Sequence, residues 1–381
     1  MNPSFLFTVC QRGAEHVLKQ EVAREHPNFR FAYSRPGFVT FKLPEGEPLD
    51  EDAELRCVFA RTHGFSLGKV QGDTAERLAA ALWQLAGERA FDHVHVWQRD
   101  AALPGDGGFE PGLTPLAEEV GRVIAQRMPA APPRTGPPLV NRVAKAGHRI
   151  LDCLLVEPDQ WWIGWHRASS MPSRWPGGVP KIELPAEAAS RTYLKTSEAL
   201  LWSRLPIQPG DRCVEIGSAP GGSCQALLER GLHVIGIDPA EMDPAVLEHP
   251  DYTHIRARTA SLKRSEFRGV RWLTVDSNVA PAHTLDEVEH IVTNRQVHVR
   301  GMLLTLKMPD WSLAEAIPEY LQRIRSWGYH YVNARQLAFD RQEICVAALQ
   351  SRELRRPPVQ RQRTRQTTPR PRRRMDQAPE A

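Results

Sequence analysis

Long apolar runs and paired cysteines are both missing from this 381-residue sequence. No apolar stretch approaches the roughly 20 residues that cross a bilayer, which predicts a chain without a membrane partner. Residues 5–10 form only a short apolar patch without a basic leader, so we expect no signal peptide. The six cysteines are scattered and form no C-x-x-C pair, which indicates neither a zinc site nor a disulfide framework. These absences predict a cytoplasmic protein without a bound metal.

A strong excess of charge is also lacking, because 49 basic and 45 acidic side chains leave a formal net charge of +4. The segment from Arg352 onward holds ten arginines and three acidic residues, so the rest of the chain is slightly acidic. A uniformly basic surface for nucleic acid is therefore not visible, although local basic patches are compatible with this balance. Residues 351–381 are polar, rich in arginine and proline and poor in aliphatic side chains, which predicts a disordered tail.

The remaining sequence divides into two zones with different patterning. Residues 1–185 mix strand and helix patterns around a Pro/Gly-rich interruption at 103–112, which predicts an α+β region. Residues 186–350 alternate strands and helices with few breaks, which predicts a doubly wound α/β domain with a parallel sheet and helices on both faces. We expect strands at 212–216, 233–237, 272–275, 302–306 and 344–349, and helices at 193–205, 225–230 and 317–327. In such sheets ligands bind beyond the carboxyl ends of the strands.

A glycine-rich loop, Glu215-Ile-Gly-Ser-Ala-Pro-Gly-Gly222, follows the first of these strands directly. Its spacing fits neither the G-x-G-x-x-G pattern of dinucleotide sites nor a phosphate-binding P-loop. The next strand ends at Asp238, and an acid at that place can accept hydrogen bonds from both hydroxyls of a ribose. The combination indicates a nucleoside-bearing cofactor without a pyrophosphate, against the plainer reading of a turn followed by a solvated aspartate. The candidate cofactor-binding residues are Glu215, Gly217, Ser218, Ala219, Pro220, Gly221, Gly222, Asp238 and Asp276.

Four ionisable residues, Lys195, Asp276, Lys307 and Glu343, are predicted at the ends of elements around this sheet. A lysine or glutamate alone at such a place is most simply a solvated side chain, whereas Asp276 beside the loop fits a structural and a functional role equally well. Only the combination of the four indicates a catalytic centre. A lysine beside a hydroxyl can stabilise the developing alkoxide and, if its pKa is lowered, accept the proton. We expect Asp276 to orient Lys307 and the hydroxyl, and Lys195 and Glu343 to complete a network of alternating charge.

These motifs, read in order, resemble the FtsJ-type ribose 2′-O-methyltransferases. The matching stretches are Ser190-Arg-Thr-Tyr-Leu-Lys195, the glycine-rich loop, Val-Asp276-Ser-Asn-Val, Leu-Lys307-Met and Gln-Glu343-Ile-Cys-Val-Ala. That family uses a Lys-Asp-Lys-Glu tetrad, whose members fall on Lys195, Asp276, Lys307 and Glu343. The resemblance implies a Rossmann-like class I methyltransferase fold over residues 186–350. It also implies S-adenosylmethionine as cofactor and RNA 2′-O-ribose methylation as the reaction.

The N-terminal half resembles the THUMP-containing branch of RNA methyltransferases, including those that modify large-subunit ribosomal RNA. The similarity lies at Phe7-Thr-Val-Cys-Gln-Arg-Gly-Ala-Glu15 and at residues 150–166. It implies that residues 1–185 combine a ferredoxin-like and a THUMP-like part that binds RNA, with ribosomal RNA as the expected partner. Many relatives carry an acid for the adenine amino group after the third strand, but residues 255–260 contain none.

For several residues the sequence leaves two roles to compare. His93 and His95 form either a metal pair or, as we expect, an ordinary strand. Trp161, Trp162 and Trp165 either stack on bases or, as we expect, pack in a core. Cys345 is predicted to be a core residue rather than a nucleophile. The alternative function is an inactive methyltransferase-fold factor that binds RNA or assists ribosome assembly. The sequence leaves the oligomeric state open.

Overall fold

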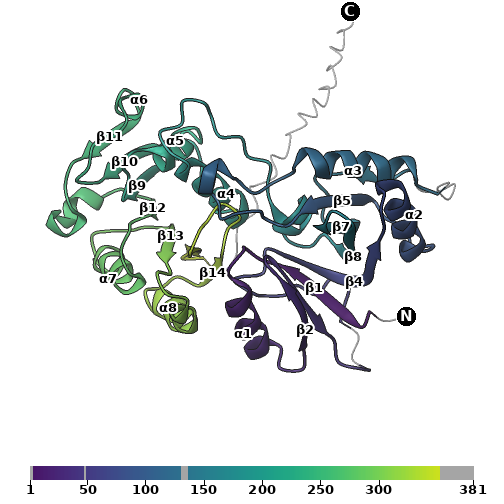
Figure 1. Ribbon diagram of the computed structural model, residues 1–381. Helices are drawn as coiled ribbons and strands as arrows, with labels where there is room; N and C mark the ends of the chain where they lie inside the picture. Colours follow the sequence, from purple (N-terminus) through teal and green to yellow (C-terminus); the bar gives the residue numbers. More distant parts are fainter. Residues whose placement is uncertain (1–2, 47–48, 130–135, 352–381) are drawn as a thin grey trace, which may run out of the picture.

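The computed structural model describes residues 3–46, 49–129 and 136–351, which form two sheets side by side (Figure 1). The predicted disordered tail lies outside these residues. In the described part of the chain, no helix is long and apolar enough to cross a membrane. The predicted boundary near residue 185 falls between the last strand of the first sheet, β8 (Gln160–Arg167), and the first helix beside the second, α4 (Thr192–Ser203).

The N-terminal sheet has eight strands in the order β2-β3-β1-β4-β8-β7-β5-β6. Its long strand β4 pairs with β1 on one side and β8 on the other, so it joins the strands at both ends of the N-terminal region into one sheet. Helices α2 and α3 bury their apolar faces on it through Leu78, Leu82 and Ile124. The elements are β1 (Phe5–Val9), α1 (Glu15–Glu25), β2 (Arg30–Arg35), β3 (Phe38–Lys42), β4 (Thr62–Gln71), α2 (Ala75–Ala86), β5 (His93–Gln98), α3 (Pro115–Gln126), β6 (Leu139–Val140), β7 (Arg149–Glu157) and β8.

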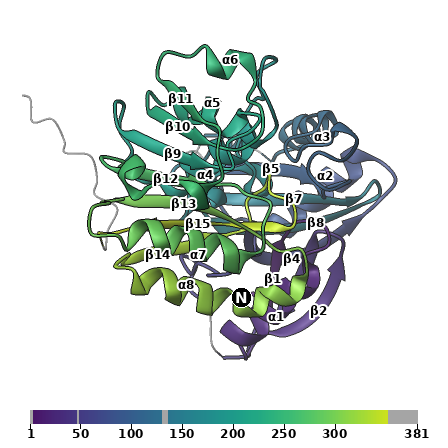
Figure 2. The ribbon, with the colours of Figure 1, turned by 90° about the vertical axis from the view of Figure 1, so that its left-hand side faces the viewer.

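The C-terminal sheet has seven strands in the order β11-β10-β9-β12-β13-β15-β14 (Figure 2). Alternate residues of its strands face opposite helices, because Cys213 lies in the core with α4, α5 and α6 whereas Val214 lies in the core with α7 and α8. Helices on both faces were predicted, and this is confirmed. The elements after α4 are β9 (Arg212–Ile216), α5 (Gly222–Leu228), β10 (His233–Ile237), α6 (Pro244–Leu247), β11 (Tyr252–Ile255), β12 (Trp272–Val275), α7 (Pro281–Val292), β13 (Gly301–Lys307), α8 (Ile317–Ser326), β14 (Tyr331–Arg335) and β15 (Glu343–Leu349).

The expectation of an all-parallel sheet is wrong at its last strands. β15 runs antiparallel to β13 and to β14. Only residues 336–342 connect β14 to β15, and so short a connection favours an antiparallel return over the crossover that a parallel strand requires. The reversal places the start of β15 opposite the end of β13, so that Glu343 pairs with Lys307.

The secondary features follow the plainer interpretations. His93 and His95 lie buried in β5, as expected for an ordinary strand. Trp161 and Trp165 are buried in the N-terminal core, and Cys345 is buried in β15. Trp162 is partly buried and packs on Tyr33 and Phe38. His166 is another polar residue buried in the first sheet. It is buried in β8, where Asp152 lies 2.6 Å from its ring nitrogen.

Candidate active site

The four predicted polar residues meet at the carboxyl edge of the C-terminal sheet. Lys195 comes from α4, Asp276 follows β12, Lys307 ends β13, and Glu343 begins β15. The two lysines alternate with the two carboxylates in a closed square. Lys195 Nζ lies 2.7 Å from Asp276 Oδ2 and 2.9 Å from Glu343 Oε1, and Lys307 Nζ lies 2.7 Å from Asp276 Oδ1. The fourth side is a hydrogen bond from Lys307 Nζ to Glu343 Oε2.

Because these groups are largely buried, the pKa of each depends strongly on the charges of its neighbours. The side chain of Lys195 is 8% exposed, and that of Lys307 is 20% exposed. Burial opposes the charge on Lys195, but Asp276 and Glu343 outweigh it and raise the pKa of this ammonium. For both carboxyl groups burial is likewise outweighed, above all by Lys195, so the pKa values of Asp276 and Glu343 are lowered. A lowered lysine pKa, which we considered from the sequence, is therefore not found at Lys195.

The glycine-rich loop lies against the square. A Cβ on Gly217 (φ +80°) would lie 2.5 Å from the carbonyl oxygen of Asp276, so only glycine permits this approach. A Cβ on Gly222 would lie 2.5 Å from the carbonyl oxygen of Ser190, in the segment that leads into α4. The loop therefore joins the ends of β9 and β12 to the helix that carries Lys195.

The other predicted cofactor residues differ in how they face the loop. Asp238 accepts hydrogen bonds from the backbone N–H groups of Ala219 (3.1 Å) and Ala240 (2.8 Å), so it holds the loop in place. Each carboxylate oxygen has a lone pair left for a ligand hydroxyl. Gly221 is buried and Pro220 is exposed. Glu215 and Ser218 are buried beneath the loop, so their side chains face the protein interior.

Burial also raises the pKa of Glu215 to about 8, with Thr274 Oγ1 donating a hydrogen bond to its carboxyl group. Its Oε1 has no hydrogen-bond partner, and the same is true of the buried Ser277 Oγ just after Asp276. A cavity of about 20 Å³, bounded in part by Lys195, Glu215 and Asp276, lies under the square. The glycine-rich backbone, the unpaired hydroxyl of Ser277 and the carboxylate of Asp238, which keeps lone pairs for a ligand, together fit a nucleoside-bearing cofactor.

Sequence reasoning missed Asp340, which lines the same cavity. It is 1% exposed, and burial followed by the nearby Glu343 raises its pKa well above the usual value. Its backbone and side chain organise the turn before Glu343, because Leu337 N–H donates to Asp340 Oδ2 at 2.9 Å. The available signal was an acid three residues before Glu343, next to the apolar run Leu337-Ala-Phe339.

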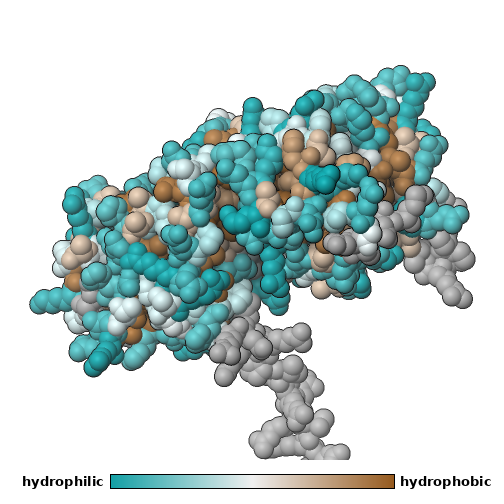
Figure 3. Space-filling view, turned by 90° about the horizontal axis from the view of Figure 1, so that it is seen from below, coloured by the Kyte–Doolittle hydropathy of each residue, from teal (hydrophilic) through white to brown (hydrophobic). Residues whose placement is uncertain are grey.

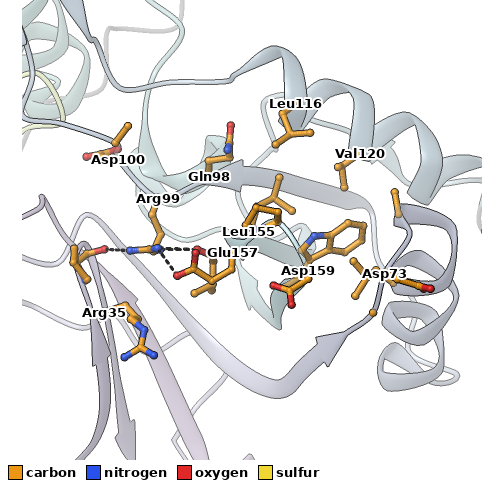
Figure 4. A pocket seen from close by; sticks show the side chains of 18 of the residues that line it. Arg35, Asp73, Gln98, Arg99, Asp100, Leu116, Val120, Leu155, Glu157 and Asp159 are labelled. Carbon is orange, nitrogen blue, oxygen red and sulfur yellow. Dashed lines mark hydrogen bonds and ion pairs between the residues drawn. The ribbon is translucent and has the colours of Figure 1, made fainter. Parts of the chain in front are cut away.

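Two larger hollows lie in other parts of the molecule. One, of about 710 Å³, is lined by the N-terminal sheet and the starts of α2 and α3, with three arginines against four acidic residues (Figure 4). The other, of about 970 Å³, lies between the two sheets and is lined by seven arginines and three glutamates. The arginines of this interdomain cleft are Arg24, Arg56, Arg61, Arg174, Arg204, Arg325 and Arg335. The excess of positive charge in the interdomain cleft is the stronger signal for an anionic partner.

Comparison with known proteins finds similarity along most of the chain. Residues 188–317 match the FtsJ-like methyltransferase family. Over 366 residues the chain is 28% identical to ribosomal RNA large subunit methyltransferase M of Halorhodospira halophila, covering 91% of this chain and 97% of that protein. The protein of the same name from Xanthomonas oryzae pv. oryzae is 28% identical over 362 residues, covering 91% and 99%. The chain therefore carries an FtsJ-like methyltransferase domain, and Lys195, Asp276 and Lys307 lie within it.

Proposed function

We propose that this protein transfers a methyl group from S-adenosylmethionine to a ribose 2′-hydroxyl of large-subunit ribosomal RNA. The observation that carries the proposal is the closed square of two lysines and two carboxylates beside the glycine-rich loop. The likeness to ribosomal RNA large subunit methyltransferase M along most of the chain supports the choice of RNA.

The proposed cofactor site uses the turn at Gly217–Gly222 and the acid Asp238. We assign backbone contacts to the turn and the ribose hydroxyls to Asp238, whose carboxylate is already held by Ala219 and Ala240. When bound, S-adenosylmethionine supplies a methyl group on a positively charged sulfur, so its leaving group needs no proton. The chemical difficulty is therefore the ribose hydroxyl, which is a weak acid and a poor nucleophile.

Lys307 is the member of the square placed to act on that hydroxyl. Its side chain is more exposed than that of Lys195, 20% against 8%, so it is the lysine that a ribose can reach. Asp276 and Glu343 fix the position of its Nζ, which donates a hydrogen bond to the hydroxyl oxygen as negative charge develops there. The oxygen bonds to the methyl carbon as the carbon–sulfur bond breaks, and the hydroxyl proton is released to water beside the partly exposed Lys307. Lys195, buried and cationic, keeps the two carboxylates ionised and aligned. Alignment of the hydroxyl with the methyl group supplies a further part of the rate.

We assign the RNA backbone to the interdomain cleft, where arginines outnumber glutamates seven to three. Phosphate groups are the polyanion that such a surface attracts, and these contacts position an RNA without reading its sequence. The division into an RNA-binding region at 1–185 and a methyltransferase domain at 186–350 remains a proposal. So do the THUMP-like assignment and the cytoplasmic location.

The test is a map of ribose methylation across total RNA from cells with and without the gene. We expect one site in large-subunit ribosomal RNA to be lost, restored by the wild-type copy and not by Lys307→Ala. Lys181→Ala is the matched control, because Lys181 is 82% exposed and pairs only with its neighbour Glu183 among the ion pairs described. Full restoration by Lys307→Ala would refute the role given to this lysine. An inactive assembly factor would leave the map unchanged and would not need to bind S-adenosylmethionine in calorimetry.

A further inference from the structure

The turn at residues 336–342 connects β14 to β15 and delivers Glu343 to the charge square. Two sides of the molecule hold its backbone. From the methyltransferase side, the buried carboxylate of Glu198 accepts hydrogen bonds from Ala338 N–H (2.9 Å) and Phe339 N–H (3.0 Å). Met308 N–H donates to the carbonyl oxygen of Gln342 at 2.8 Å, next to Lys307. These bonds account for only one side of the turn.

The N-terminal region holds the other side through Gln11, which follows β1. Its Nε2 donates to the carbonyl oxygen of Asp340 at 2.8 Å, and its Oε1 accepts from Gln336 Nε2. Both glutamine side chains are 3% exposed. The two partners of Gln11 lie 329 and 325 residues further along the chain, so this contact exists only when both sheets are assembled.

The direction of these bonds is fixed by the chemistry of the partners. Gln336 Nε2 also donates to the carbonyl oxygen of Arg341 at 2.8 Å. Because both neighbours of this nitrogen are oxygen acceptors, the amide of Gln336 has one favourable orientation, and Gln11 must present its oxygen to it. The result is a buried, directional chain of hydrogen bonds from the N-terminal region to residues 340 and 341.

Residue 341 is in turn connected to the square. Arg341 N–H donates to Glu343 Oε1 at 3.3 Å, and Lys195 Nζ lies 2.9 Å from that same oxygen. The side chain of Arg341 donates to Asp106, so a second N-terminal residue holds this position. A shift of Asp340 or Arg341 would therefore displace the carboxylate that contacts both lysines.

We infer that Gln11 is a positioning residue of the active site, through which the N-terminal region holds Glu343 in place for methyl transfer. This inference rests on the proposed function, because it concerns the rate of that reaction. It assigns the N-terminal region a part in organising the catalytic centre in addition to binding RNA.

The test compares Gln11→Met with Thr8→Val in the full-length protein. Methionine keeps the length of the side chain and removes both hydrogen bonds. Thr8 is 0% exposed and donates a hydrogen bond to the carbonyl oxygen of Val39 at 3.0 Å, so its variant removes a buried bond of β1 that does not touch the turn. We expect Gln11→Met to lower kcat about tenfold at unchanged KM for S-adenosylmethionine, and Thr8→Val to stay within about twofold. Equal losses in the two variants would overturn the inference.

A double-mutant cycle with Glu343→Gln separates positioning from general destabilisation. If Gln11 acts through Glu343, Gln11→Met lowers kcat no further in the Glu343→Gln background. Losses that multiply would contradict the inference. Should Gln11→Met fail to fold, Gln336→Met removes the same bond from the other end and carries the same expectation.

Hydrogen exchange keeps this test independent of the proposed reaction. We expect the amides of Ala338 and Phe339 to exchange faster in Gln11→Met and at the wild-type rate in Thr8→Val. Unchanged exchange would overturn the inference even if the wild-type protein methylates ribose. A wild-type protein that methylates no ribose would instead refute the proposed function, while the exchange result still tests the coupling.

Discussion

Removal of each of the two lysines of the charge square should affect stability and activity to different degrees. Lys195 is 8% exposed and contacts both Asp276 and Glu343, so Lys195→Met leaves two buried carboxylates facing each other with one cation fewer. Loss of one partner from a buried ion pair costs about 3–5 kcal/mol. We expect a loss of that order in the free energy of unfolding for Lys195→Met, measured by urea denaturation. Lys307→Met, at a position 20% exposed to water, should lose clearly less stability while losing more activity. Equal losses of stability would contradict this division of labour.

The buried carboxyl group of Glu215 leads to a prediction about how the stability of the protein changes with pH. Burial raises its pKa to about 8, whereas an unfolded chain restores the ordinary value of 4.5. Between these two values the folded state binds the extra proton, so stability falls as pH rises, by at most about 1.4 kcal/mol per pH unit. Glu215→Gln keeps an uncharged group in place of the protonated carboxyl and removes this dependence. We therefore expect its melting temperature to exceed that of the wild type increasingly from pH 5 to pH 8.5. A constant difference across this range would show that Glu215 does not titrate there.

At the scale of elements, the glycine-rich loop supports a matched comparison of two glycines. Gly217 and Gly210 have nearly the same backbone conformation, with φ of +80° and +83°. A Cβ on Gly217 meets the Asp276 carbonyl oxygen at 2.5 Å, whereas a Cβ on Gly210 meets nothing within 4 Å. Both Gly→Ala changes introduce left-handed strain of roughly 1 kcal/mol, and only Gly217→Ala displaces Asp276.

We therefore expect Gly217→Ala to weaken S-adenosylmethionine binding at least tenfold in calorimetry and to lower kcat. Gly210→Ala should bind like the wild type and lose only a little stability in thermal unfolding. If the two variants bind the cofactor equally well, close packing of the loop on Asp276 is not what shapes the cofactor site.

The elements also show how far sequence patterning reaches. The predicted bounds of β9, β10 and β12 are the observed ones. β10 and β12 are largely apolar, as strands buried on both faces are, and β9 is marked by the glycine-rich loop that follows it. β14 was missed, since Tyr331-Val-Asn-Ala-Arg335 has few apolar residues and lies at the edge of the sheet. α5 begins at Gly222 rather than at 225, because the glycine-rich loop itself opens the helix.

The residues of the site, like the elements, could be predicted only in part from the sequence. Asp276, Lys307 and Glu343 were predictable because each follows, ends or begins a strand with a recognisable pattern, whereas Lys195 lies in the helix before the first strand and was assigned through the family order. Gln11 and Gln336 were not predictable, because their importance arises from tertiary hydrogen bonds between residues more than 300 positions apart. No local pattern marks a buried glutamine that bonds to a distant backbone carbonyl.

At the scale of the whole molecule, the two sheets meet through buried polar contacts and through aromatic ones. Trp311, which precedes α8, lies edge-on to Phe59 with ring centroids 5.7 Å apart. His16 of α1 also lies edge-on to the Trp311 ring, with centroids 6.0 Å apart. Arg191, four residues before Lys195, forms an ion pair with Glu110 at 2.8 Å. Seen from below, polar side chains cover most of the surface, and apolar patches are small and separated (Figure 3). A polar surface of this kind is compatible with a charged partner such as RNA, whose interfaces with proteins are polar and hydrated.

The interdomain cleft supplies the prediction at this scale. Arg56 and Arg204 line it from opposite sides, one before β4 and one at the end of α4, and both are exposed. If RNA phosphates occupy the cleft, each arginine contributes one charge contact, and the affinity falls with salt in proportion to the number of contacts. Arg56→Glu together with Arg204→Glu should then weaken binding of ribosomal RNA fragments at least tenfold. The slope of log affinity against log salt should become shallower by about two.

Arg122→Glu is the control, because Arg122 is exposed on α3 and does not line the cleft. It changes the net charge of the protein by the same amount per residue, so it removes the general electrostatic effect from the comparison. Binding is measured by filter retention between 50 and 300 mM salt, and S-adenosylmethionine affinity is measured in parallel to show that the methyltransferase domain is intact. The assignment of RNA to the cleft fails if Arg122→Glu changes the slope as much per residue as the cleft variants do. In that case RNA responds to the charge of the whole molecule, and the seven arginines between the two sheets do not form a distinct site.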